Sequence, residues 1–278
     1  MLLPFNLPDE GTFMRNICAT AVVTAATLIA TSAHAEEKNW TGFYVGVDVG
    51  VGFNLGDSGE LEFRRADGTD NSAAINTAFG DNFDGKFDAG NILGLKAGID
   101  WRVNNWAYGV IFDIAKTDLA QEQSAFSSTP ATYVERRTVD TLATFRGRLA
   151  WAANDTILPY VTAGLAYGDV EYSWQGNSGA FRGDNGNDSG WQAGYTVGIG
   201  VEVQYSERMS FGLEYSLSNL GNENFQTRFD GGGNDPLGIS GATMAFGSPA
   251  SGGTVAQGTD DDFDFQTLKL SWNYKLSR

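Results

Sequence analysis

Residues 191–205 read WQAGYTVGIGVEVQY and alternate strictly between two kinds of residue. Odd positions carry aliphatic or aromatic side chains, whereas even positions carry glycine, threonine, glutamine or glutamate. Because successive side chains of a strand point to opposite faces, this period of two predicts a β-strand with one apolar face.

The same alternation occurs in seven other stretches, separated by connections that are short and long in turn. The other stretches are residues 43–54, 93–101, 106–114, 139–151, 161–167, 209–217 and 268–276. The short connections are Val103 to Asn105, Ala153 to Ile157 and Ser206 to Arg208, and the long ones are residues 55–90, 116–138, 171–190 and 219–262. Such alternation is typical of barrels that cross the bacterial outer membrane. It predicts an all-β fold, an eight-stranded antiparallel up-and-down transmembrane β-barrel. The barrel would have four long extracellular loops and three short periplasmic turns, with both mature termini in the periplasm.

A water-soluble β-sandwich also has alternating strands, but two features favour a membrane barrel. The non-apolar face is rich in Gly, Ala, Ser and Thr, as expected inside a narrow barrel, where a solvated face would be rich in Lys and Glu. Aromatic residues also gather at strand ends, where interfacial girdles form. The predicted interfacial aromatics are Trp40, Phe43, Trp101, Trp106, Trp151, Tyr160, Tyr205, Trp272 and Tyr274.

The N-terminal segment has the charged, apolar and small-residue order of a secretory signal. The apolar run of residues 17–30 is too short for a spanning helix, and TSAHA (31–35) has the small residues of a cleavage site. We therefore expect residues 1–35 to be a signal peptide and residues 36–278 to be the outer-membrane β-barrel domain.

The start of translation is a separate question, because acidic residues precede the basic region of this signal. Asp9 and Glu10 lie ahead of Met14 and Arg15, where a signal peptide is usually positive. We expect translation to begin at Met14.

The composition excludes several functions. A formal charge of −16 makes nucleic acid an unsuitable partner. Cys18 and His34 are the single cysteine and the single histidine, and both lie in the predicted signal peptide. The mature chain could therefore form no disulfide, Cys or His metal site, or Ser-His-Asp triad. We expect no catalytic residues, cofactor or metal, since paired carboxylates inside a sealed barrel would have no access to substrate.

The interior positions of the predicted strands carry charges of both signs at similar heights. This interior charge layer contains Asp48, Lys96, Asp100, Arg146, Arg148, Glu202, Glu214 and Lys269. In an eight-stranded barrel, paired charges would fill the interior as a plug, which we favour, or would line a narrow pore. The pore interpretation is favoured by the glycines at interior positions, which are Gly46, Gly50, Gly94, Gly98, Gly198 and Gly200.

Several segments resemble the Omp25/Omp31-type outer-membrane proteins, porin-like barrels of Alphaproteobacteria. They are WTGFYVG (40–46), FRGRLAWA (145–152), PYVTAGLAYG (159–168), VGIGVE (197–202) and LEYSLSNLG (213–221). The resemblance covers nearly all of the mature chain and implies an abundant eight-stranded barrel with roles in envelope integrity and surface interactions. Such barrels commonly end on an aromatic residue that the barrel-assembly machinery recognises, whereas here Tyr274 is followed by KLSR (275–278).

Three functions remain open from the sequence. The first is a structural barrel that supports the envelope and displays its loops, with lipids, lipopolysaccharide and a host-surface ligand as partners. The second is a small diffusion channel. The third is a hemin-binding or adhesin-type surface protein, for which Tyr133 and Tyr172 are candidate ligands in place of histidine. The oligomeric state is not indicated.

Overall fold

The structure is a computed structural model that describes most of the chain after residue 39. The described residues are 40–56, 59, 61–65, 83–127, 131–152, 154–176, 182–185, 190–221, 226–230, 254–259 and 263–276. The predicted signal peptide and most of the acidic loop residues lie outside them. Within the described part, no helix is long and apolar enough to cross a membrane.

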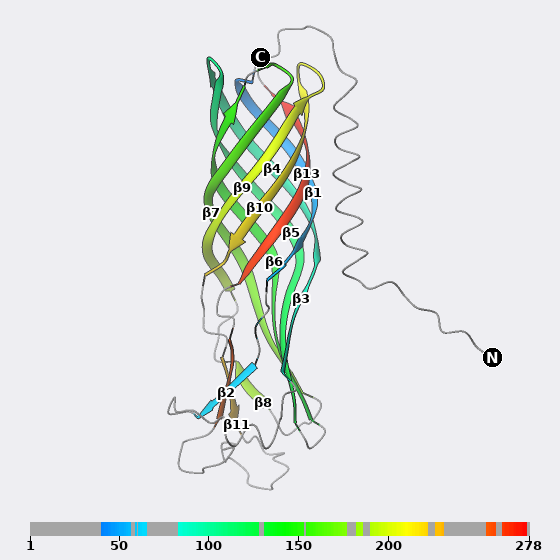
Figure 1. The fold of residues 1–278 in the computed structure, drawn as a ribbon, viewed down its shortest axis with the longest axis vertical. Coiled ribbons are helices and arrows are strands. Elements are labelled where there is room, and N and C mark those ends of the chain that lie inside the picture. Colours follow the sequence, from blue (N-terminus) through cyan, green and yellow to red (C-terminus); the bar gives the residue numbers. More distant parts are fainter. Residues whose placement is uncertain are drawn as a thin grey trace, which may run out of the picture.

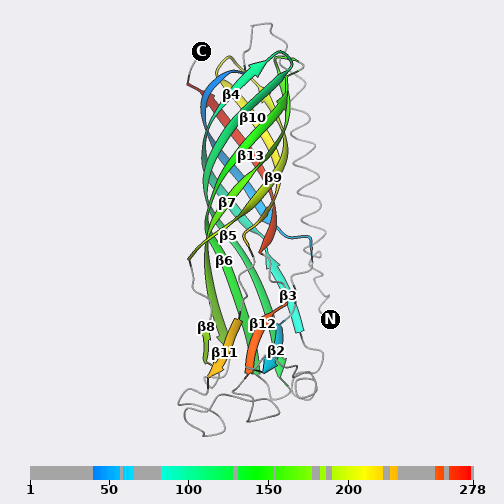
Figure 2. The same cartoon turned by 90° about the vertical axis from the view of Figure 1, so that its left-hand side faces the viewer.

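Eight tilted antiparallel strands form a closed ring, which Figures 1 and 2 show as a narrow cylinder. The ring closes where the first strand pairs with the last one, for example Val47 with Trp272. In spatial order the ring consists of β1 (Gly42–Phe53), β4 (Gly90–Val103), β5 (Trp106–Ser127), β6 (Ala131–Trp151), β7 (Ile157–Gly176), β9 (Gly190–Gln204), β10 (Met209–Asn219) and β13 (Asp264–Lys275). The predicted eight-stranded barrel is confirmed.

The period of two sorts side chains between the outside and the inside of the ring. In β9, the odd-numbered Tyr195 and Ile199 are exposed on the outer face, whereas the even-numbered Thr196 and Glu202 are buried inside. Other ring strands repeat this pattern, so a continuous apolar band surrounds the barrel. An outward apolar band combined with a polar interior is the arrangement expected of a barrel in lipid.

The three predicted short connections all lie at one end of the ring, which we call the turn end. Asn104 has a φ of 56°, a left-handed conformation that asparagine tolerates better than most residues. The side-chain Oδ1 of Asn154 accepts hydrogen bonds from the backbone N–H groups of Thr156 and Ile157. The Oγ of Ser206 plays the same role for Met209 at 3.1 Å. These local bonds replace ladder pairing and allow the chain to reverse within a few residues.

At the opposite end, which we call the loop end, the prediction of a long loop over residues 116–138 was wrong. Strand β5 continues to Ser127 and β6 begins at Ala131, and the two pair along nearly their whole length with an irregularity between Lys116 and Leu119. Beyond the apolar band both faces of these strands are polar or mixed. The apolar period that marks the membrane segment therefore disappears although the strand continues.

The remaining long connections also contain strands. Strand β3 (Phe83–Asp88) pairs with the outer part of β5, where it takes the place of β4. A separate four-stranded sheet combines segments from three connections, in the order β2 (Leu61–Arg65), β12 (Thr254–Gly258), β11 (Gln226–Asp230) and β8 (Arg182–Asn185). Figures 1 and 2 show this sheet at the loop end, away from the C-terminus. The sheet packs on β5, since a Cβ at Gly258 would lie 2.2 Å from the side chain of Gln123.

Candidate functional site

A cluster of six buried charges occupies the middle of the barrel, and each charge comes from a different strand. Three cations face three carboxylates, so the cluster is formally neutral. We call it the central cluster, and its members are Asp48 on β1, Lys96 on β4, Asp113 on β5, Arg146 on β6, Glu214 on β10 and Lys269 on β13.

Arg146 lies at the centre of this cluster and is fully buried. Its two terminal nitrogens bind different carboxylates, with Nη2 at 2.9 Å from Asp113 and Nη1 at 2.7 Å from Glu214. Lys269 Nζ lies 3.2 Å from the same aspartate and 3.4 Å from the same glutamate. Thr144 donates a further hydrogen bond to Asp113 at 2.6 Å. The shared partners join four strands through one network.

The other lysine completes the cluster on the side of β1 and β13. Lys96 Nζ lies 2.8 Å from Asp48 Oδ1 and donates a hydrogen bond to the hydroxyl of Ser271 at 2.7 Å. Both charged side chains are almost completely buried. A buried ion pair is stable only when its partners are well placed and further hydrogen bonds satisfy the charges. Asp113 meets that condition, whereas Asp48 has no hydrogen bond within the described residues and depends on its ion pair with Lys96.

A second group of charges lies closer to the turn end and is built around Arg148. This guanidinium contacts Asp100 at 2.9 Å and Glu202 at 2.5 Å. Glu202 also accepts hydrogen bonds from Ser210 and from Asn273. The ring of Tyr160 lies 4.1 Å from the Arg148 guanidinium carbon, a cation–π contact. We call this group the lower cluster.

All eight sequence-predicted charges therefore point into the barrel, in two layers. Asp113 also belongs to the central cluster, although it is not among the eight charges predicted from the sequence. It lies between the outward residues Phe112 and Ile114, in the same alternation that identified the other interior charges. Following the interior positions of residues 106–114 would have found it.

Two of the predicted interfacial aromatics are wrong, because Trp40 and Tyr160 face the interior. Both are more than nine-tenths buried, and they pack with Ala107, Ala150, Ala152 and Leu158 in an apolar cluster at the turn end. Tyr160 occupies an inward position of β7, next to the outward Val161, so the register decides its side. The other predicted aromatics lie on the outer surface and are at least 40% exposed: Phe43, Trp101, Trp106, Trp151, Tyr205, Trp272 and Tyr274.

The interior glycines make room for large side chains and do not line an open passage. A Cβ at Gly98 would lie 2.4 Å from the ring end of Tyr44, and one at Gly200 would lie 2.4 Å from the ring end of Tyr160. At Gly50 it would lie 3.0 Å from the side chain of Lys269. Each of these three glycines is therefore covered by a neighbouring side chain.

Between the central cluster and the loop end, the interior becomes apolar. Leu119, Val139, Leu220, Phe263 and Phe265 are all at most 1% exposed and form one packed layer. Farther out, Arg137 lies over the ring of Phe263 at 4.9 Å and donates a hydrogen bond to Gln121 at 2.5 Å. The described interior is thus filled on both sides of the charges.

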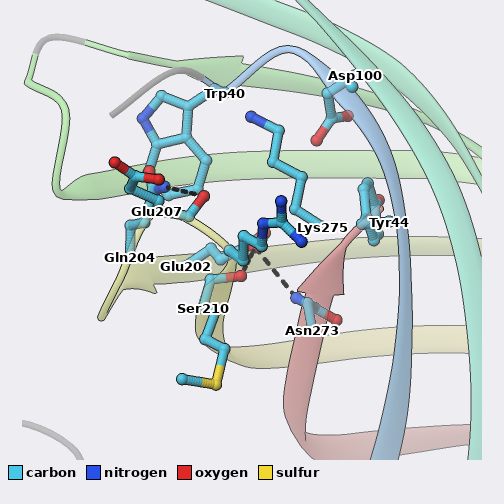
Figure 3. A pocket seen from close by; sticks show the side chains of 12 residues that line it. Trp40, Tyr44, Asp100, Glu202, Gln204, Glu207, Ser210, Asn273 and Lys275 are labelled. Carbon is cyan, nitrogen blue, oxygen red and sulfur yellow. Dashed lines mark hydrogen bonds between the residues drawn. The ribbon is translucent and has the colours of Figure 1, made fainter. Parts of the chain in front are cut away.

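The free spaces that remain inside are small. The cavity beside Asp113, Arg146 and Lys269 has a volume of about 10 Å³, which at most holds one water molecule. The opening at the turn end has about 30 Å³, and Figure 3 shows Lys275 reaching into it between Trp40 and Asp100. Neither space offers room for a solute such as a sugar or an amino acid.

Of the two candidate hemin ligands, the structure describes the side chain of Tyr172 alone. Tyr172 is buried in the apolar layer and its hydroxyl accepts a hydrogen bond from Gln192 at 2.7 Å. The side chain of Tyr133 lies outside the described residues. Among the described residues, no group of three or more His, Cys, Asp or Glu side chains is arranged to hold a metal ion.

Comparison with known proteins supports the architecture. Residues 21–275 match the family model described as outer membrane protein beta-barrel domain. The chain belongs to this family. The match spans all the ring strands and includes part of the predicted signal peptide.

Two relatives of the family agree with the resemblance to Omp25/Omp31-type proteins. The 31 kDa outer-membrane immunogenic protein of Brucella melitensis is 27% identical over 216 residues, which cover 76% of this chain and 84% of the relative. The 22 kDa outer membrane protein of Rhizobium leguminosarum is 29% identical over 188 residues, or 67% of each chain. The resemblance inferred from the sequence is confirmed, and the chain is an outer-membrane barrel protein in contact with membrane lipids.

A solved barrel shares the fold at low sequence identity. The outer membrane protein OprG from Pseudomonas aeruginosa aligns with 87% of this chain and with 100% of its own, with a TM-score of 0.51 and 11% identity. At that identity the likeness concerns the fold alone.

Proposed function

We propose that this protein is a structural outer-membrane barrel that contributes to envelope integrity and displays its loop-end strands for surface interactions. The observation that supports this function is the filled interior. A neutral network of ion pairs, an apolar layer and two small cavities leave no described passage for a solute. A diffusion channel would need a continuous aqueous path, and an enzyme would need a site that a substrate can reach.

The orientation and the processing of the chain are part of the same proposal. The turn end faces the periplasm, as in barrels with short periplasmic turns, and the long connections face outward. Translation begins at Met14, and residues 14–35 are removed as the signal peptide. Intact-mass measurement of protein extracted from outer membranes would then give a chain that begins at Glu36. A mass that retains residues 14–35 would contradict the cleavage site.

The loop end offers surfaces for further partners. The long connections contain acidic segments such as DGTD (67–70) and DDDFD (260–264). These segments favour bridging by divalent cations to anionic lipopolysaccharide, and the four-stranded sheet would face a host surface. Insertion would require the barrel-assembly machinery.

The envelope role is tested with a strain that lacks the chain. Removing a structural barrel should raise the uptake of a hydrophobic dye, because the membrane becomes less tightly packed, and should leave the uptake of small hydrophilic solutes unchanged. Complementation with the intact chain should restore the barrier. Slower uptake of hydrophilic solutes in the deletion strain, with normal dye exclusion, would contradict the proposal and favour a channel.

A further inference from the structure

The outer wall of the barrel contains an apolar groove on the side formed by β4, β1 and β13. Its volume is about 380 Å³, and its lining includes Val45, Val47, Leu95, Trp272 and Tyr274. These five side chains all belong to outward positions of the ring and lie in the part of the apolar band near the turn end. The groove therefore opens toward the membrane, and Gly46 and Lys96 complete its lining.

The register explains why the surface is hollow at this place. Val47 lies between Leu95 on β4 and Trp272 on β13, and Val45 lies between Ala97 and Tyr274. Two short β-branched side chains thus form a floor, the aromatic rings form one wall, and Leu95 forms the other. The floor follows β1.

A positive charge lies at the turn-end rim of this groove. Arg208, in the turn between β9 and β10, is exposed, and its Nη1 lies 3.3 Å from the hydroxyl oxygen of Tyr274. The guanidinium is thus held beside the last aromatic residue of the groove wall. The neighbouring Glu207 is among the residues that line the opening of the barrel (Figure 3). A guanidinium is the side chain best suited to bind a phosphate.

We propose that the groove binds one anionic glycerophospholipid of the periplasmic leaflet. An acyl chain lies along Val45 and Val47 between Leu95 and Trp272, and the headgroup phosphate binds Arg208 at the rim. An apolar groove with a cationic rim matches a lipid whose chain is apolar and whose head is negative. The inference rests on the proposed orientation, because the periplasmic leaflet is the one that faces the turn end.

The test uses the full-length protein extracted from outer membranes in mild detergent and measured by native mass spectrometry. Phosphatidylglycerol and phosphatidylethanolamine with identical acyl chains are added in turn. The wild-type barrel should retain one phosphatidylglycerol at least about fivefold better than phosphatidylethanolamine, because the ethanolamine ammonium carries a positive charge that offsets the attraction between Arg208 and the phosphate. Arg208→Gln should abolish this preference and leave weak, equal retention of both lipids. Val47→Trp, which fills the groove, should reduce the retention of both.

The matched control is Val161→Trp on β7, since Val161 is also exposed in the apolar band but lines no described groove. It should retain lipid as the wild type does. Equal retention of the two lipids by the wild type, or unchanged retention in Val47→Trp, would overturn the proposal. Heat-modifiable gel mobility checks that every variant is a closed barrel. The result is independent of the envelope role, because lipid retention is measured on the isolated protein.

Discussion

Arg146 shows at the scale of single residues what keeps the barrel interior in place. Its guanidinium is buried and bridges carboxylates from β5 and β10 while its own backbone belongs to β6. Removing Arg146 would leave Asp113 and Glu214 to share Lys269 and would give the buried cluster an excess negative charge, which is far more costly than losing an exposed pair. The interior charges thus act as fixed cross-links between strands.

Two chemically identical substitutions should differ greatly in their effect on the free energy of unfolding. Arg146→Met should lower the free energy of unfolding by about 3–5 kcal/mol, because Asp113 and Glu214 lose the guanidinium that pairs with both of them. Arg136→Met should change it by about 0–1 kcal/mol, since Arg136 is partly exposed where it pairs with Glu122 and Asp88. Urea titration of the folded barrel in lipid vesicles measures both. Equal effects would show that the central cluster adds little to stability.

Single residues also show where the sequence argument succeeded and failed. The eight charges could be predicted because each lies at the non-apolar position of an alternating stretch. Tyr160 was misplaced because an aromatic residue near a strand end was taken as interfacial without following the register of its strand from Val161. The cation–π contact of Tyr160 with Arg148 and its packing over Gly200 depend on strand pairing, which the composition of a single strand does not reveal.

At the scale of the strand, the stability of β9 in the membrane depends on an outer face that is as apolar as the lipid around it. Its outward residues are apolar along the whole length, and Ile199 is among the most exposed of them. The cost of a charge on such a face depends on depth, being highest at the midplane and small near the interfaces.

A depth series on this strand tests whether the outer face contacts hydrocarbon. Ile199→Arg, near the middle of β9, should lower the free energy of unfolding in vesicles by about 2–4 kcal/mol, whereas Tyr205→Arg, directly after β9 at the turn end, should lower it by about 0–1 kcal/mol. The same urea titration provides the comparison. A position-independent cost would argue against membrane burial of this face.

The lengths of the strands were the least predictable part of the fold. The membrane segments of β5 and β6 follow from their apolar dyads, but the outer halves contain residues such as Gln121, Gln123, Glu135 and Arg137 at buried positions. Polar side chains on both faces of a strand resemble a loop when the sequence alone is considered. The pairing of residues such as Gln121 with Arg137 is what makes these segments strands.

At the scale of the whole molecule, the described ring strands form a closed cylinder whose interior is filled in successive layers. The turn end holds Trp40 and the lower cluster, the middle holds the central cluster, and the loop end holds the apolar layer with Phe263 and Phe265. The closed ring was predictable, since strand number and alternation of connections were both visible in the sequence. The filling of the interior could be recognised only from the side-chain contacts in the structure.

The most direct test of the sealed interior is the single-channel conductance of the folded mature chain in a planar bilayer. The barrel should give no steady openings across a wide range of voltage and salt, and heat-modifiable mobility would confirm that inserted protein is folded. Steady, salt-dependent openings that change when Asp48 or Lys96 is neutralised would contradict the account and identify the interior charges as the lining of a pore.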